Sequence, residues 1–284
     1  MTGRAHASRV AVVTGGGRGI GRAIALALAD DGLHVHVVSR TATQVEQVVT
    51  DIRSRGGSAC AVALDVSRAR QVQAALGGCK GVRCGVPQVL VNAAGVFGPL
   101  ARVAGGDPDA WISTLLVNTV GTYLTCRALV DGMVASGWGR IVNVSSAAAQ
   151  GAPAPLNSAY TTSKVAVNWF TRCLALELAD TRVTANTLHP GEVQTGMWRD
   201  IGANAERLNA EGEDFRQWAA LVGRTGGDPP ENATAAVRWL LAEAADSISG
   251  EFVWIAGSLK TPINPPASPA PYVVDCLRSG RELR

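Results

Sequence analysis

The chain has 284 residues, 47% of them apolar, and carries a formal net charge of +3 at neutral pH. This length and apolar content predict one large α/β domain, while the mild charge argues against nucleic-acid or membrane partners. No apolar run reaches the roughly 20 residues that span a bilayer. The start of the chain lacks the apolar core of a signal peptide, so we expect a cytoplasmic protein with a flexible N-terminus over residues 1–8.

Strand-like and helix-like segments alternate along the chain. Apolar, β-branched runs predict strands near residues 10–13, 34–38, 59–64, 88–91, 140–144, 182–188 and 251–255. Helical patterns fall between them, near residues 20–30, 43–55, 68–78, 108–136, 158–180 and 230–243. This alternation predicts an α/β fold, a doubly wound parallel sheet of about seven strands with helices on both faces. We expect it to form one domain over residues 9–258.

The cysteines and histidines give no sign of a metal centre or a disulfide framework. Six cysteines are scattered without a C-x-x-C pair, and the chain contains four histidines. Cys60, Cys126 and Cys173 fall within apolar segments and are predicted to be small buried side chains. We therefore expect no bound metal.

A glycine-rich turn separates the first strand from the first helix. Its residues are Gly15, Gly17, Arg18, Gly19, Ile20 and Gly21. Strand, glycine turn and helix in this order direct helix N–H groups toward a pyrophosphate. The spacing departs from the common G-x-G-x-x-G template because Ile20 replaces a glycine. A generic βα turn is the alternative, but the flanking strand and helix both favour a dinucleotide site.

The second strand ends in Ser39 and Arg40, where many NAD-binding folds place an acidic residue on the ribose 2′-hydroxyl. Arg40 and Arg18 together offer two guanidinium groups, which suit a 2′-phosphate better than a hydroxyl. Two solvated surface arginines are the alternative reading. The pattern favours NADP(H) over NAD(H).

Three polar positions within predicted helices, Asn118, Tyr160 and Lys164, indicate chemistry. Tyr160 and Lys164 are four residues apart, so their side chains share one face of the predicted helix. An ammonium group beside a phenol stabilises the phenolate and prepares it for proton transfer near neutral pH. Asn118 lies within the predicted helix 108–136, where it is either functional or a satisfied core amide.

Six motifs occur in a fixed order: Thr14-Gly-x-x-x-Gly19-Ile20-Gly21, Asn92-Ala93-Ala94-Gly95, Asn118, Ser145-Ser146, Tyr160-x-x-x-Lys164 and Pro190-Gly191. In this order the chain resembles the short-chain dehydrogenase/reductase family, in its compact single-domain branch, over roughly residues 8 to 258. It is similar to carbonyl reductases and to 3-oxoacyl-(acyl carrier protein) reductases. The resemblance implies a Rossmann-type fold and an NADP(H)-dependent oxidoreductase that transfers hydride between nicotinamide and a ketone or secondary alcohol.

The resemblance also implies the catalytic roles. Tyr160 gives a proton to the carbonyl oxygen or removes it in the reverse direction, and Lys164 lowers the pKa of Tyr160 and binds the nicotinamide ribose. Ser146 hydrogen-bonds the substrate oxygen, and Asn118 holds a water that links Lys164 to solvent. Ser146 lies fourteen residues before Tyr160, one more than is commonest, so Ser145 stays an alternative.

Further contacts follow from the same resemblance. Asp65 meets the adenine amino group and Val66 contributes a backbone contact. The residues that face the rest of the cofactor are Asn92, Ala93, Ala94, Gly95, Pro190, Gly191, Val193 and Thr195. Ala93 replaces the second asparagine usual in the family. The substrate pocket is formed by Phe97, Ser146, Ala147, Met197 and Trp198, beneath a lid over residues 196–228.

Several alternatives and associations stay open. A 3-oxoacyl-(acyl carrier protein) reductase would need a basic rim, but the lid interleaves Arg199, Arg207, Arg216 and Arg224 with Glu206, Glu211, Glu213 and Asp214. A non-catalytic nucleotide-binding regulator usually lacks the tyrosine or the lysine. We expect a small-molecule carbonyl or alcohol substrate, and an apolar or cyclic ketone in particular.

Residues 108–136 and 158–180 are apolar on more than one side, which predicts a homodimer or homotetramer. The Pro-rich tail, 259–284, is either disordered or an extended arm.

Overall fold

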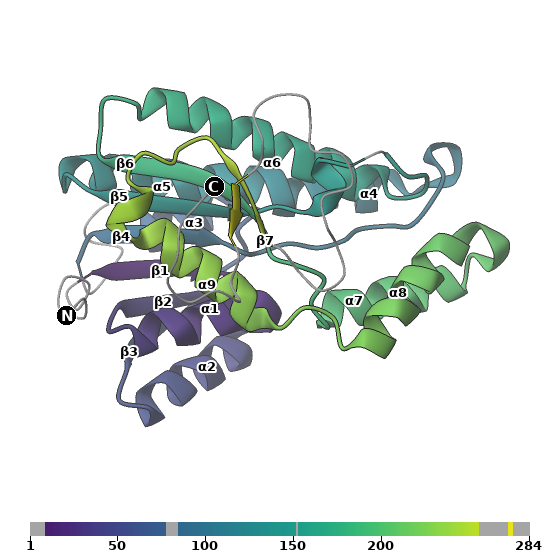
Figure 1. The fold of residues 1–284 in the computed structure, drawn as a ribbon, viewed down its shortest axis with the longest axis horizontal. Coiled ribbons are helices and arrows are strands. Elements are labelled where there is room, and N and C mark those ends of the chain that lie inside the picture. Colours follow the sequence, from purple (N-terminus) through teal and green to yellow (C-terminus); the bar gives the residue numbers. More distant parts are fainter. Residues whose placement is uncertain (1–8, 78–84, 152, 256–271, 275–284) are drawn as a thin grey trace.

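The structure is a computed structural model that describes residues 9–77, 85–151, 153–255 and 272–274. Its strands form one eight-stranded sheet (Figure 1). The strands lie in the order β3-β2-β1-β4-β5-β6-β7-β8, and every neighbouring pair is parallel. Their bounds are β1 (Val10–Thr14), β2 (His34–Ser39), β3 (Ser58–Ala63), β4 (Pro87–Asn92), β5 (Gly139–Val144), β6 (Val183–His189), β7 (Phe252–Ile255) and β8 (Tyr272–Val274).

The predicted fold class is confirmed, and all seven predicted strands are present within one or two residues of their expected bounds. The eighth strand, β8, was not predicted. It lies in the Pro-rich tail and pairs with β7 at the edge of the sheet. An edge position is where a strand close to prolines is tolerated, because a missing backbone donor there interrupts no ladder. Most of the tail lies outside the described residues.

Helices cover both faces of the sheet, as the sequence predicts. Figure 1 shows α1, α2 and α9 on one face and α3, α4, α5 and α6 on the other, while α7 and α8 project from one end. Their bounds are α1 (Gly19–Asp30), α2 (Ala42–Ser54), α3 (Ala69–Leu76), α4 (Pro108–Leu115), α5 (Gly121–Ala135), α6 (Ser158–Glu177), α7 (Gly196–Glu206), α8 (Glu213–Thr225) and α9 (Pro230–Leu241). None of these helices is both long and apolar enough to cross a membrane, in the part of the chain that is described.

Alternate residues of the strands supply two separate cores. On β2, Val35 and Val37 pack with α1 and α2, whereas Val38 belongs to the core beneath α3 and α5. Both faces are covered, so the strands carry apolar side chains on both sides. The lid helices have a smaller core of their own around Ile201 and Ala205.

The predicted helix over residues 108–136 is interrupted. A π-helical turn, Leu116–Val120, separates α4 from α5 and contains Asn118. Side-chain bonds accompany this turn: Thr122 Oγ1 donates to the Asn118 carbonyl at 2.7 Å, and Thr119 Oγ1 donates to the Ser163 carbonyl at 3.0 Å. The apolar pattern continues through the segment, so periodicity alone predicts one uninterrupted helix. Single π-turns of this kind are frequent at functional sites.

The sheet order reverses between β1 and β4, and this point sets the place of the site. The chain leaves β1 toward β2 on one side, while β4 continues toward β5 on the other. A crevice therefore opens beyond the carboxyl ends of the strands, where ligands of open α/β sheets bind. Thr14 and Asn92, the last residues of β1 and β4, are register partners at this edge.

Candidate active site

The glycine turn after β1 approaches neighbouring backbone too closely for side chains. Gly15 has a φ of +66°, and a Cβ built on it would lie 2.6 Å from the Ala93 carbonyl oxygen. A Cβ on Gly21 would lie 2.3 Å from the Gly15 carbonyl oxygen. These contacts are with backbone and cannot be relieved by a side-chain movement, so the turn requires glycine at both positions. The result is an open cradle of backbone at the start of α1.

A cavity of about 370 Å³ extends from this turn along the ends of the strands. The predicted cofactor residues that line it are Gly15, Arg18, Gly19, Ile20, Gly21, Ser39, Arg40, Asp65, Val66, Ala93, Ala94, Gly95, Tyr160, Lys164, Pro190 and Thr195. We call this space the cofactor cavity. Four predicted residues lie elsewhere: Gly191 and Val193 line a second cavity, Gly17 packs against Ser39 and Gln44, and Asn92 is in the core.

Asn92 ties the sheet to two helices. Its Nδ2 donates to Asn143 Oδ1 at 2.9 Å, and its Oδ1 accepts from Thr125 Oγ1 at 2.7 Å. Asn143 in turn donates to Thr171 Oγ1 on α6. Only 3% of Asn92 is exposed. Its side chain therefore fixes β4 beside the cavity and does not reach into it, and a cofactor contact through Asn92 stays a prediction.

Asp65 shapes the turn before α3 and also faces the cofactor cavity. Its Oδ1 accepts from the Ser67 amide at 3.0 Å and from Ser67 Oγ at 2.7 Å, which shapes the turn before α3. Burial alone would raise the pKa of Asp65, but the Ser67 hydrogen bonds and the charge of Arg40 hold it below its usual value. The carboxylate lines the cofactor cavity together with Arg40 and Arg18, both of which are exposed.

Tyr160 stands where the cofactor cavity meets a second cavity, because it lines both. Its phenol lies near the Ser146 hydroxyl, and its ring stacks on Phe97 with centroids 4.6 Å apart. Burial raises the pKa of Tyr160 to about 12, the Ser146 hydrogen bond lowers it in part, and the charge of Glu192 adds to the rise. The phenol is therefore a protonated hydrogen-bond donor in the free protein.

Lys164 is one helical turn along α6 from Tyr160 and is buried beside it. Its Nζ donates to the Val144 carbonyl at 2.8 Å and lies 5.8 Å from the centre of the Tyr160 ring. Burial lowers the pKa of Lys164 to about 8. The sequence predicts that Lys164 lowers the pKa of Tyr160, but in the free protein burial prevails and that pKa is raised.

The two adjacent serines point to different partners. Ser145 is buried, and its hydroxyl donates to Asn168 Oδ1 on α6 at 2.5 Å. Ser146 Oγ accepts from the Ala148 amide at 3.2 Å and contacts the Tyr160 phenol. Ser146 is thus the serine whose hydroxyl is grouped with Tyr160, while Ser145 joins β5 to α6.

Asn118 is fully buried, and both ends of its amide are engaged. Its Oδ1 accepts from the Val96 amide at 2.8 Å, and its Nδ2 donates to the Val96 carbonyl and to Ser163 Oγ, each at 2.9 Å. A Cβ on Gly95 would lie 3.4 Å from Asn118 Oδ1 and 3.6 Å from Lys164 Nζ. Asn118 therefore clamps the segment after β4 and shares a small space with Lys164 that Gly95 leaves open.

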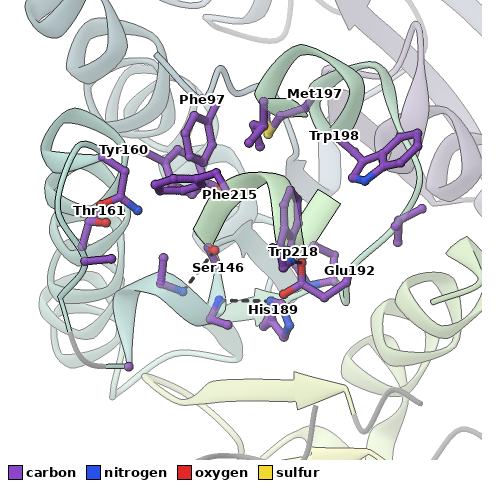
Figure 2. A pocket seen from close by; sticks show the side chains of 18 of the residues that line it. Phe97, Ser146, Tyr160, Thr161, His189, Glu192, Met197, Trp198, Phe215 and Trp218 are labelled. Carbon is purple, nitrogen blue, oxygen red and sulfur yellow. Dashed lines mark hydrogen bonds between the residues drawn. The ribbon is translucent and has the colours of Figure 1, made fainter. Parts of the chain in front are cut away.

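The second cavity, of about 390 Å³, lies between the end of the sheet and the lid helices and is called the substrate cavity below. All five predicted pocket residues line it: Phe97, Ser146, Ala147, Met197 and Trp198. Figure 2 shows the rings of Phe97, Phe215 and Trp218 gathered around it with Tyr160. Phe215 and Trp218 come from α8, so the predicted lid segment contributes directly to the walls.

His189, Glu192 and Trp254 are among the residues of this cavity that sequence reasoning missed. His189 ends β6, and its Nδ1 accepts from the Ala147 amide at 3.1 Å. Trp254, from β7, stacks obliquely on His189 with centroids 4.7 Å apart. Glu192 directly follows the Pro190-Gly191 motif, which was the one available signal that it could face the substrate.

A polar cluster also lies away from both cavities, on β2 and β3. His34, His36 and Cys60 have potential ligand atoms within 4.8 Å of one another, because the strand register sets His36 beside Cys60. Cys60 Sγ and His36 Nδ1 are 2.9 Å apart, and burial with the nearby His34 lowers the pKa of His36 to about 4. The absence of metal stays a prediction.

Of the cysteines predicted to be buried, Cys126 is buried, Cys60 is half-buried and Cys173, on α6, is exposed.

Comparisons with known proteins agree with this geometry. A family model described as short chain dehydrogenase matches residues 9–206. The chain is 39% identical to the short-chain reductase protein NovJ of Streptomyces niveus, over 87% of this chain and 92% of that protein. Among solved structures, actinorhodin polyketide ketoreductase with NADPH is similar with a TM-score of 0.80 and 30% identity, covering 89% and 97% of the two chains. A 3-oxoacyl-[acyl-carrier protein] reductase from Brucella melitensis gives 0.71 and 29%, covering 88% and 90%.

Proposed function

The chain belongs to the short chain dehydrogenase family, and from this premise we propose that it is an NADP(H)-dependent ketoreductase. Membership makes it an oxidoreductase that acts on alcohol or carbonyl groups and uses a nicotinamide cofactor. The preference for NADP(H) and for an apolar or cyclic ketone is the proposal. One observation carries it: Tyr160 lines both the cofactor cavity and the substrate cavity, and Ser146 lies near its phenol.

The cofactor cavity fits a dinucleotide. Gly15 and Gly21 leave no room for a Cβ, so the glycine turn is bare backbone at the start of α1. Backbone N–H groups at a helix start are what a pyrophosphate binds. Arg18 and Arg40 would hold a 2′-phosphate, and Asp65 would accept from the adenine amino group. Lys164 would bind the nicotinamide ribose. When NADP(H) is bound, its nicotinamide supplies or accepts the hydride.

The proton chemistry belongs to Tyr160 and its neighbours. Because burial keeps the phenol protonated, Tyr160 can donate to a ketone oxygen as negative charge develops there. Ser146 would donate a second hydrogen bond to the same oxygen, which stabilises the transition state. Lys164, with a pKa of about 8, would provide the nearby positive charge that favours the phenolate left after transfer. Asn118 would hold a water molecule that links Lys164 to solvent.

The likeness to the Brucella melitensis protein supports a second candidate, a 3-oxoacyl-(acyl carrier protein) reductase. The charges around the substrate cavity favour a free ketone instead. Glu192, Glu211 and Asp214 line the cavity, and its described lining contains no lysine or arginine. An acidic carrier protein would meet like charge there.

We also propose that the protein is a homo-oligomer, with a homodimer as the minimal unit. Large apolar side chains stay exposed along α4, the π-turn, α5 and α6, namely Ile112, Leu116, Val120, Tyr123, Val165, Trp169 and Leu176. Trp169 is 65% exposed and Leu176 is 78% exposed. A monomer would leave this apolar surface in water, whereas a second copy would cover it. A cytoplasmic location likewise stays a prediction.

The test of the proposed reaction is direct. Purified protein is incubated with NADPH or NADH and with aryl and cyclic ketones, while nicotinamide absorbance and alcohol formation are followed together. We expect NADPH to be oxidised in step with alcohol formation, and NADH to be used far less. Equal use of both cofactors would contradict the assignment of Arg18 and Arg40, and no alcohol from any ketone would contradict the reaction.

A further inference from the structure

Two histidines and a cysteine lie together on the sheet, outside both cavities, and the proposed reaction does not involve them. His34 and His36 are two residues apart on β2, so their side chains lie on the same face of the strand. Cys60 lies on the neighbouring strand β3, where it is the register partner of His36. One potential ligand atom from each residue lies within 4.8 Å of the other two. We call these three residues the His/Cys cluster.

Both histidine rings of the cluster carry a buried nitrogen atom that makes no hydrogen bond to the described part of the chain. These atoms are Nε2 of His34 and Nε2 of His36. The whole of His36 is only 2% exposed, and the two rings meet edge to face with centroids 5.1 Å apart. Buried polar atoms in folded proteins are nearly always satisfied, and a bound ion is one way to satisfy them. Two such atoms in adjacent rings therefore point to a ligand at this place.

Other contacts of the cluster orient the rings. His34 Nδ1 lies 2.6 Å from the hydroxyl oxygen of Ser58, the register partner of His34 on β3. A histidine that binds a metal through one ring nitrogen usually hydrogen-bonds through the other, which fixes the ring. His36 Nδ1 lies 2.9 Å from Cys60 Sγ, so the thiol and the buried ring are already in contact. The cluster therefore has both potential ligands and a group that would orient one of them.

The donor atoms select a class of metal. Imidazole nitrogen and thiolate sulfur suit Zn²⁺ and related transition metals, whereas Mg²⁺ and Ca²⁺ prefer oxygen ligands. Cys60 would bind as a thiolate and release its proton to solvent. The thiolate charge would offset that of Arg53, a cationic neighbour of His34 whose guanidinium donates to the Ala59 carbonyl at 2.9 Å. A metal-bound thiolate still accepts hydrogen bonds, so Cys60 need not give up its other contacts.

We propose that His34, His36 and Cys60 bind one Zn²⁺ ion or a similar transition-metal ion, with water as the fourth ligand. His34 and Cys60 are half-buried, so one side of the site is accessible to water. The ligands come from two strands, so the ion would tie β3, the edge strand of the described sheet, to β2. Because the cluster lies outside both cavities, we assign the ion a structural role. This site goes beyond the proposed reaction and does not depend on it.

The test uses the full chain without a histidine tag, freed of metal by a chelator and titrated with Zn²⁺ in a calorimeter. We expect native protein to bind Zn²⁺ with one site per chain and to give no binding heat with Mg²⁺. Cys60→Ser and His34→Gln should each weaken Zn²⁺ binding by at least about tenfold, since losing even an orienting partner costs that much. Cys173→Ser, which changes an exposed cysteine of α6 outside the cluster, is the matched control and should bind as native protein does.

Two further measurements locate the ion and check that the variants fold. Co²⁺ in place of Zn²⁺ should give a thiolate-to-metal absorption band with native protein and none with Cys60→Ser. Zn²⁺ should also raise the urea midpoint of native protein and of Cys173→Ser, because it binds the folded chain, and leave the midpoints of Cys60→Ser and His34→Gln nearly unchanged. A cooperative unfolding transition of each variant without metal shows that its loss of binding is not a loss of fold.

Three results would overturn the proposal, and each can be read on its own. The first is that native protein does not bind Zn²⁺, which would support the sequence-based prediction of no metal. The second is native affinity for Zn²⁺ in both Cys60→Ser and His34→Gln, which would place the ion elsewhere. The third is a Co²⁺ complex of native protein without the thiolate band, which would remove Cys60 from the ligands and need no variant.

Discussion

The two cavities that meet at Tyr160 are built by different means. The cofactor cavity is lined by the ends of β1 to β6, by Tyr160 and Lys164 of α6, and by a glycine turn whose backbone contacts exclude side chains. The substrate cavity is formed by side chains from β6, β7, α6, α7 and α8, which come together only in the folded chain. Backbone geometry therefore shapes the glycine turn of the first cavity, whereas side-chain packing shapes the second.

Their chemical character differs in the same way. The cofactor cavity presents Arg18 and Arg40 at its outer end and few aromatic groups, as an anionic dinucleotide requires. The substrate cavity presents aromatic rings with Glu192 and Asp214. Tyr160 lies between these two chemically different surroundings. Substitutions in each cavity should accordingly change different measured quantities.

The largest effect expected away from Tyr160 concerns the oxyanion contact. Ser146→Ala should lower kcat on the order of 10²–10³-fold, because one donor to the developing oxyanion is lost. Ser145→Ala is the matched control, since the Ser145 hydroxyl donates to Asn168, although Ser145 also lines both cavities. It should lower stability more than rate. The assignment fails if steady-state kinetics show the larger loss of kcat in Ser145→Ala.

Next in size is the cofactor preference. Arg40→Asp should weaken NADPH binding on the order of a hundredfold, because a charge-assisted contact is replaced by repulsion. The affinity for NADH should fall little or rise. Arg70→Asp, an exposed change on α3 outside the cofactor cavity, makes the same change in net charge and should have little effect. Fluorescence titration with both cofactors measures this, and parallel losses in the two variants would contradict it.

A smaller effect tests the backbone-built cradle itself. Gly21→Ala should destabilise the protein by about 1–3 kcal/mol, because its methyl group would meet the Gly15 carbonyl. It should also weaken cofactor binding while leaving the substrate cavity intact. Gly105→Ala, with open space around the new methyl group, should be nearly neutral. Urea unfolding of the two variants checks this difference, and equal midpoints would argue against a rigid cradle.

The smallest effect is a pH dependence. The pKa of Lys164 is lowered to about 8 by burial, so its ammonium form is lost as the pH rises through that value. If this cation binds the ribose, NADPH affinity should be level below about pH 8 and fall by up to about tenfold per pH unit above it. Lys164→Met should bind more weakly and show no such bend. A level affinity in native protein up to about pH 10 would exclude this role.

The same contrast explains what the sequence could predict. Gly21, Ser39 and Arg40 lie within short local patterns, where turn and strand geometry follow from neighbouring residues. Their placement needed only that local order. The π-turn at Asn118 was missed because apolar periodicity continues through it, and its cause lies in bonds to Val96 and Ser163.

Long-range packing accounts for the rest. Glu192 and Trp218 form one hydrogen-bonded pair from separate segments, and neither residue signals the other in the sequence. Trp254 reaches the cavity only because β7 pairs with β6. The raised pKa of Tyr160 likewise reflects its burial, with Phe97 stacked on its ring, which the helical spacing of Tyr160 and Lys164 could not reveal.

The measurement that tests the account most directly is ketone reduction by Tyr160→Phe. The ring still stacks on Phe97, so fold and NADPH binding should be nearly unchanged, while kcat with a ketone that native protein reduces should fall on the order of 10²–10⁴-fold. Tyr123→Phe, an exposed tyrosine on α5, should keep native turnover. If Tyr160→Phe reduces the same ketone at a near-native rate, Tyr160 is not the proton donor and the account is wrong.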